Sequence, residues 1–168
     1  DGAYSLSNTL QIWYKCAAAL HTLSGSNLFH RDLQPANILV HHDELKLVDI
    51  GWAELEHTIS QTEQQLHLAK EFAAPELIQQ NESLNRRHSD VYSLAQVVVY
   101  LIVGHQLFYE YRNTDKRLEH IKEHFENRIA VDVLELLLLT LKKCLELTPQ
   151  NRFGNYVELQ EAIKKIID

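Results

Sequence analysis

Hydrophobic positions near the start of the chain recur with the spacing of an amphipathic helix. Between residues 10 and 23, apolar side chains return at steps of three or four residues: Leu10, Ile12, Trp13, Cys16, Ala17, Leu20 and Leu23. An α-helix has about 3.6 residues per turn, so this spacing places them on one face of a helix. Gly25 and Asn27 predict its end.

A polar stretch with Pro35 follows over residues 28–37, and two short apolar, β-branched runs come after it. The runs are Ile38–Val40 and Leu45–Val48, separated by polar residues 41–44. Such runs with a short polar connection predict a small β-hairpin. We expect its first strand to be buried.

Helical patterns occupy most of the remaining chain. Residues 49–71 lack a sustained period, so we expect a long loop of the kind that often carries function. Residues 89–104 are apolar on nearly every face, which predicts a central buried helix. Other helices are predicted after Pro75 and over residues 113–128, 131–147 and 155–167, the last with Tyr156, Leu159, Ile163 and Ile166 on one stripe. The predicted fold class is mainly α with a small β-hairpin.

Composition and charge limit the class of protein and its partners. The 168 residues include 16 Lys and Arg against 23 Asp and Glu, a formal net charge of −7, and 45% of them are hydrophobic. This is typical of one folded domain. Nucleic acid and anionic lipid both attract basic surfaces, so the negative charge argues against them. The apolar runs are shorter than the roughly 20 residues of a membrane span.

The Cys and Met residues indicate the cellular compartment of the protein and whether the chain is a whole protein. Cys16 and Cys144 show no CxxC spacing, so we expect a reducing compartment, the cytoplasm or, for a secreted effector, a host cytosol. The chain contains no Met. We interpret it as a piece of a longer protein.

Three short motifs occur in a fixed order along the chain. They are HRDLQPAN over residues 30–37, Asp49-Ile50-Gly51 after the predicted hairpin, and Ala74-Pro75-Glu76. With the later Ser-Asp-Val-Tyr-Ser-Leu, they resemble the catalytic loop, the DFG turn and the APE motif of the protein kinase superfamily. The resemblance implies a kinase-like C-terminal lobe over residues 1–168, with a catalytic loop at 28–37, an activation segment at 49–76 and a core helix at 89–104.

The resemblance implies ATP and Mg²⁺ as cofactors and a role for each polar residue of the motifs. Asp32 would act as the catalytic base that orients the attacking hydroxyl. Asn37 and Asp49 would bind the metal, and Mg²⁺ prefers such hard oxygen ligands. Leu39 would lie under the adenine ring. Gln34, also assigned to the cofactor site, stands where serine/threonine kinases carry a Lys that contacts the transferred phosphate.

Other matched residues are assigned structural roles by the same resemblance. Glu76 and Arg152 would form a buried ion pair that anchors the end of the activation segment. Asp90 would accept hydrogen bonds from the backbone of the catalytic loop. His30 and Ile50 would stack in the core between the two lobes of a kinase.

The chain also departs from the family pattern. Gln34 and Ala69 stand in place of a Lys and Thr couple, and a neutral amide cannot offset phosphate charge as an ammonium does. No GxGxxG occurs in the chain, so we expect the N-terminal lobe in the parent protein or in another subunit. Three functions stay open: an ATP- and Mg²⁺-dependent kinase-like phosphotransferase with a protein or small-molecule phosphoacceptor, a pseudokinase scaffold, and a small-molecule or glycan kinase.

One further motif carries a different chemistry. Residues 120–124, His-Ile-Lys-Glu-His, match an inverted zinc-protease signature, with two His on one helical face. A third ligand is unassigned in the sequence. We favour a solvated amphipathic face for this segment.

Overall fold

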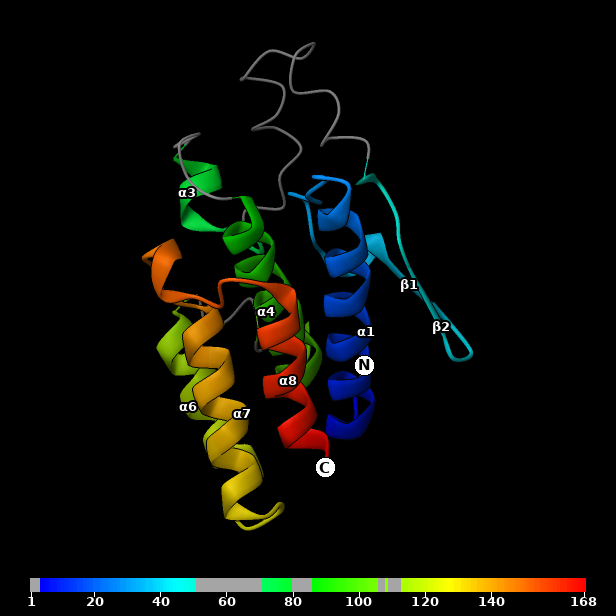
Figure 1. Cartoon of the computed structure of the whole chain (residues 1–168). Helices are drawn as coiled ribbons and strands as arrows, with labels where there is room; N and C mark the ends of the chain where they lie inside the picture. The colour runs from blue at the N-terminus through cyan, green and yellow to red at the C-terminus, as the bar shows by residue number, and fades with distance from the viewer. Residues whose placement is uncertain (1–3, 51–70, 80–85, 106–107, 109–112) are drawn as a thin grey trace.

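The structure is a computed structural model, and it describes residues 4–50, 71–79, 86–105, 108 and 113–168. Helices account for most of it (Figure 1). They are α1 (Leu6–Gly25), α3 (Pro75–Ile78), α4 (Arg86–Val103), α6 (Thr114–Phe125), α7 (Val131–Cys144) and α8 (Tyr156–Ile167). The described residues also form two short 3₁₀ helices, η1 (Pro35–Asn37) and η4 (Pro149–Asn151), and the hairpin of β1 (Ile38–His41) and β2 (Glu44–Leu47). The predicted mainly α class with one hairpin is confirmed.

Polar side chains cap the starts of some of the helices. The Ser5 side chain accepts the N–H of Asn8 at the start of α1, and the Asn155 side chain accepts the N–H of Glu158 at the start of α8. Such caps satisfy N–H groups that have no partner within the helix. Asn27, just after α1, has φ 57°, a conformation that Asn tolerates better than most residues.

Several helix ends differ from prediction. The α6 helix ends at residue 125, before the predicted end at residue 128. The α4 helix begins at Arg86, earlier than the predicted start at residue 89. The α7 helix ends at Cys144, before the predicted end at residue 147. Beyond it, the backbone carbonyls of Glu146 and Leu147 accept hydrogen bonds from the Arg152 side chain, so these two carbonyls have tertiary partners.

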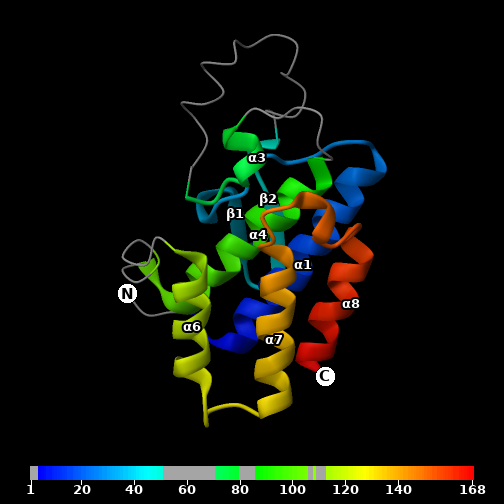
Figure 2. The same ribbon diagram turned by 90° about the vertical axis from the view of Figure 1, so that its left-hand side faces the viewer.

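The core surrounds α4, as its apolar pattern predicts. The side chains from Ser89 to Val99 are all buried, and α1, α6 and α7 pack against this helix. The α8 helix lies beside α1 and α7 (Figures 1 and 2). Trp13 of α1 and Ile163 of α8 are fully buried. Among the described helices, none has both the length and the apolar character needed to cross a membrane.

The hairpin is more exposed than predicted. Ile38 pairs with Leu47 and Val40 with Leu45 in an antiparallel register, but Leu39 and Val40 are 53% and 51% exposed. The expectation of a buried strand is therefore wrong. The hairpin projects beside α1 (Figure 1), and within the described ranges β2 is the one strand paired with β1. A sheet of two strands packed on one side leaves its other face in solvent.

Candidate active site

A buried carboxylate organises the loop that precedes η1. Asp90 of α4 accepts the backbone N–H of His30 at Oδ2 and that of Arg31 at Oδ1, each at 2.8 Å. Burial raises the pKa of Asp90, and the N–H donors of Arg31 and His30 act in the opposite direction. Arg31 has φ 67°, a left-handed conformation that costs free energy unless the surroundings hold it. The predicted role of Asp90 is confirmed.

The loop brings the side chains of Asp32, Asn37 and Gln34 together. The Asn37 amide nitrogen donates to the Asp32 carbonyl at 2.8 Å and to Asp32 Oδ2 at 3.2 Å. The Gln34 amide nitrogen donates to the same Oδ2 at 3.1 Å. Both Asp32 groups are acceptors, so the nitrogen of the buried Asn37 amide faces Asp32 and its Oδ1 is directed away.

Asp49 reaches the same region through the backbone that follows the hairpin. The Val48 N–H donates to the Asn37 carbonyl at 3.0 Å, and the His30 ring nitrogen Nε2 donates to the Val48 carbonyl at 3.0 Å. Asp49 comes directly after these contacts, with φ 60° and an exposed side chain. Asp adopts this conformation more readily than most residues. The hydrogen bond between the Val48 N–H and the Asn37 carbonyl therefore brings Asp49, the next residue, close to Asn37. Both residues carry side-chain oxygens.

The other predicted site residues fall around this group or outside the description. Leu39 is exposed on β1. His30 is fully buried and Ile50 is half-buried, and their stacking stays a prediction. Gly51 and Ala69 lie outside the described residues, so the expected role of the turn and the loss of the Lys and Thr couple stay predictions as well.

The predicted ion pair between Glu76 and Arg152 is confirmed. Arg152 donates to both Glu76 oxygens, from Nη1 at 2.6 Å and from Nη2 at 3.0 Å, and the Ser89 hydroxyl donates to Oε1 at 2.7 Å. Burial raises the pKa of Glu76, but the donors from Arg152 and Ser89 outweigh it and leave the pKa lowered. Arg152 also donates to the backbone carbonyls of three residues, His88, Glu146 and Leu147.

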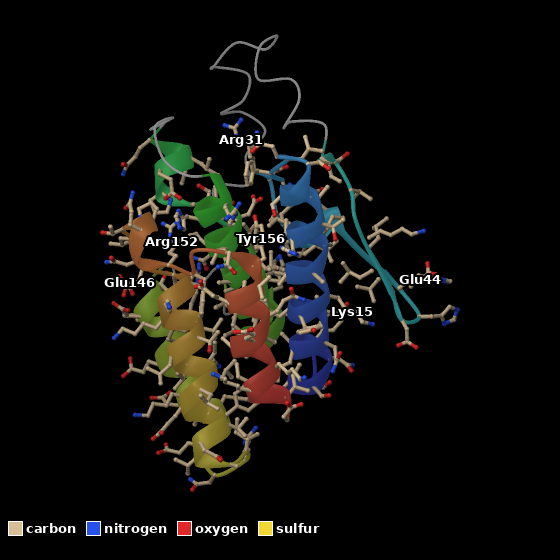
Figure 3. All side chains as sticks on the ribbon, viewed as in Figure 1. Lys15, Arg31, Glu44, Glu146, Arg152 and Tyr156 are labelled. Atoms are coloured by element: carbon tan, nitrogen blue, oxygen red, sulfur yellow. The ribbon has the colours of Figure 1, made fainter. Side chains whose placement is uncertain are left out.

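One contact of this site escaped the sequence reasoning. The Tyr156 hydroxyl donates to Asp90 Oδ2 at 3.2 Å. Tyr156 comes from α8, beyond Arg152 in the chain, and Figure 3 shows both labelled side chains in the upper half of the bundle, below Arg31. The available signal was a hydroxyl-bearing residue on the buried stripe of α8, because a buried Tyr hydroxyl usually has a hydrogen-bond partner.

The alternative zinc motif lies on α6. The rings of His120 and His124 are 6.3 Å apart between centroids, and His124 packs edge-on against Phe125. Burial, Arg128 and His120 lower the pKa of His124. Within the described part of the chain, no group of three or more His, Cys, Asp or Glu is placed to hold a metal ion.

The loop around Asp32, the β1–β2 hairpin and the buried carboxylates Glu76 and Asp90 occur together in one class of protein. The family model of the protein kinase domain matches residues 1–165, so the chain belongs to the protein kinase domain family. Its relatives include the serine/threonine-protein kinase MPS1 of Encephalitozoon cuniculi, 24% identical over 90% of this chain, and an Aurora kinase of Yarrowia lipolytica, 29% identical over 83% of it.

A solved structure supports the same fold. The kinase domain of Mycobacterium tuberculosis PknI matches with a TM-score of 0.65 and 24% identity, over 98% of this chain and 56% of that domain. The matched segments amount to 26% and 37% of the lengths of the MPS1 and Aurora relatives. This chain therefore corresponds to part of each of these kinases.

Proposed function

We propose that this chain is the C-terminal, catalytic half of an ATP- and Mg²⁺-dependent phosphotransferase. The observation that carries the proposal is the hydrogen bonding of Asp32 with Asn37, next to the backbone link that leads to Asp49. A kinase site must position reactants and neutralise phosphate charge. A carboxylate base and two oxygen ligands, held within one short region, meet the first of these requirements.

The proposed base is Asp32. Its Oδ2 accepts from Gln34 and Asn37, which fixes the plane of the carboxylate. Its Oδ1 would orient an acceptor hydroxyl and take its proton. Named relatives are serine/threonine kinases, which makes a protein hydroxyl the first acceptor to test. A small-molecule hydroxyl is the alternative.

The proposed metal ligands are Asn37 Oδ1 and the Asp49 carboxylate. The two Asn37 donor contacts to Asp32 turn its Oδ1 away from that residue, and this oxygen would be the metal ligand. Mg²⁺ takes few protein ligands and completes its shell with water and phosphate oxygens, and when bound it would neutralise the phosphate charge. Asn37 and Asp49 together supply a ligand set of this kind.

A nucleotide site needs more than this chain. The Gly-rich loop and the strand Lys of a kinase belong to the N-terminal lobe, which we propose to lie elsewhere in the parent protein or in another subunit. Leu39, exposed on β1, would contact the adenine ring from below.

The test is phosphate transfer by the full-length protein that contains this chain. We predict that Asp49→Asn lowers Mg²⁺-dependent transfer from ATP to a panel of protein acceptors by about 100-fold or more, because one metal ligand loses its charge. Asp43→Asn is the matched control, an exposed carboxylate in the hairpin turn. Equal transfer by Asp49→Asn and the unaltered protein would contradict the proposal.

Gln34 favours a second candidate, a pseudokinase scaffold. Its neutral amide hydrogen-bonds Asp32 and brings no positive charge to the site. An unaltered full-length protein that binds ATP but transfers no phosphate, with or without Mg²⁺, would support the scaffold and exclude the enzyme.

A further inference from the structure

The carboxylate of Asp90 receives three hydrogen bonds, and one comes from a distant part of the chain. Two are the backbone N–H groups of His30 and Arg31. The third is the Tyr156 hydroxyl, which shares Oδ2 with His30. With two donors on Oδ2 and one on Oδ1, the rotation of the carboxylate about its Cβ–Cγ bond is restricted.

Tyr156 is well suited to be a fixed donor. It is 1% exposed, and it is the first residue of α8, directly after the Asn155 cap. Burial, and then the Asp90 carboxylate, raise the pKa of the Tyr156 phenol above its usual range. The hydroxyl therefore keeps its proton and remains a donor to Asp90 at every pH at which the protein would be assayed.

The position of Asp90 bears directly on the proposed base. Arg31 is held at φ 67°, and its N–H is bonded to Asp90 Oδ1. Asp32 is the next residue, so its backbone direction depends on that left-handed turn. A rotation of the Asp90 carboxylate would release the Arg31 N–H and allow Asp32 to change direction.

We propose that Tyr156 is a positioning residue for the catalytic loop, acting through Asp90 on the backbone of His30 and Arg31. Its catalytic consequence rests on the proposed function, and its effect on the loop does not. The proposal extends the site from the loop to the last helix of the chain.

Tyr92 offers a matched control for a purely structural role. Its hydroxyl also takes part in a buried hydrogen bond, accepting from the Gln96 side chain at 3.1 Å, and the residue is 7% exposed. Both residues of that pair belong to α4, and the bond does not include Asp90. Tyr92→Phe and Tyr156→Phe each remove one buried hydroxyl and keep the ring, so their packing changes are alike.

The experiment compares Tyr156→Phe with Tyr92→Phe in the full-length protein. The first readout is hydrogen exchange in peptides that cover residues 28–32. We expect Tyr156→Phe to speed exchange at the His30 and Arg31 amides by about tenfold, because local opening becomes easier. The second readout is phosphate transfer, where we expect kcat to fall about tenfold and KM for ATP to stay within about twofold. Tyr92→Phe should change neither.

The two measurements test the positioning role of Tyr156 and the proposed function separately. Unchanged exchange in Tyr156→Phe, or an equal increase in Tyr92→Phe, would overturn the positioning role. Faster exchange at residues 28–32 in a protein without phosphate transfer would support the positioning role and remove the proposed function. Faster exchange with an unchanged kcat would overturn the link between loop position and catalysis.

Discussion

Two buried carboxylates, Glu76 of α3 and Asp90 of α4, form hydrogen bonds with different kinds of donor. Glu76 is bonded to a cation, the Arg152 guanidinium, and to the Ser89 hydroxyl. Asp90 is bonded to neutral donors, two backbone N–H groups and the Tyr156 hydroxyl. The pKa of Glu76 is lowered and that of Asp90 is raised. Burial opposes ionisation at both carboxylates, and at Glu76 the hydrogen bonds from Arg152 and Ser89, together with the Arg152 charge, reverse the direction.

The difference indicates a division of roles. The Glu76 and Arg152 pair connects α3, at the end of the predicted activation segment, to the stretch after α7, and breaking it leaves a buried charge without a partner. Asp90 fixes a backbone conformation next to the proposed base. We therefore expect changes at the ion pair to act mainly on stability, and changes at Asp90 to act on both stability and catalysis.

The largest expected effect is that of Arg152→Ala. Removing the guanidinium leaves Glu76 as a buried, unpaired carboxylate, which typically costs about 3–5 kcal/mol. In a domain of this size, that corresponds to a fall in melting temperature of roughly 6–20 °C, measured by calorimetry. Arg128→Ala is the control, because Arg128 contacts His124 at the surface, and its effect should stay within about 0.5 kcal/mol. A melting temperature unchanged by Arg152→Ala would contradict the pairing.

A smaller loss is expected for Asp90→Asn. An amide has one acceptor oxygen, so its NH₂ group would face one of the two backbone N–H groups and leave that donor unsatisfied. Such a buried, unsatisfied group costs about 1–3 kcal/mol, which chemical denaturation can measure. We also expect faster exchange at the His30 and Arg31 amides. If Asp90→Asn were as stable as the exposed-site control Asp43→Asn, the anchoring role of Asp90 would have to be abandoned.

The smallest expected effect is a pH dependence from Glu76. Its pKa is lowered below the ordinary value of 4.5 in the folded protein, so the ionised carboxylate stabilises the fold above pH 4.5. That contribution is lost as the pH falls through the lowered pKa. The stability difference between the unaltered protein and Glu76→Gln, measured in urea, should therefore narrow below pH 4.5. A constant difference down to acid unfolding would show that Glu76 does not titrate as described.

Local pattern was enough to predict most of the helices, but the exposure of the hairpin was predicted wrongly. Amphipathic spacing located α1 and α8, and continuous apolar character located α4. The apolar run Ile38–Val40 predicted a strand correctly and its burial incorrectly, because burial depends on which elements cover a sheet. Ile38, Leu45 and Leu47 of the hairpin pack against the core, whereas Leu39 and Val40 are exposed.

The site was predicted through family resemblance more than through pattern. The motif HRDLQPAN singled out Asp32 and Asn37, and their hydrogen bond lies within one loop. Tyr156 was predicted only as a buried stripe residue. Its hydroxyl meets a residue separated from it by 66 positions in the chain, and no local spacing encodes such a contact.

The amino-acid sequence alone determined the positions of the helices and the hairpin, and the residues that carry the kinase resemblance, because helix periodicity and short motifs are local properties. The tertiary structure decided that the Tyr156 hydroxyl meets Asp90 as a third donor. It also decided the exposure of β1. These features depend on packing between distant segments, and the energy of a buried polar group is set by the partners that packing brings to it.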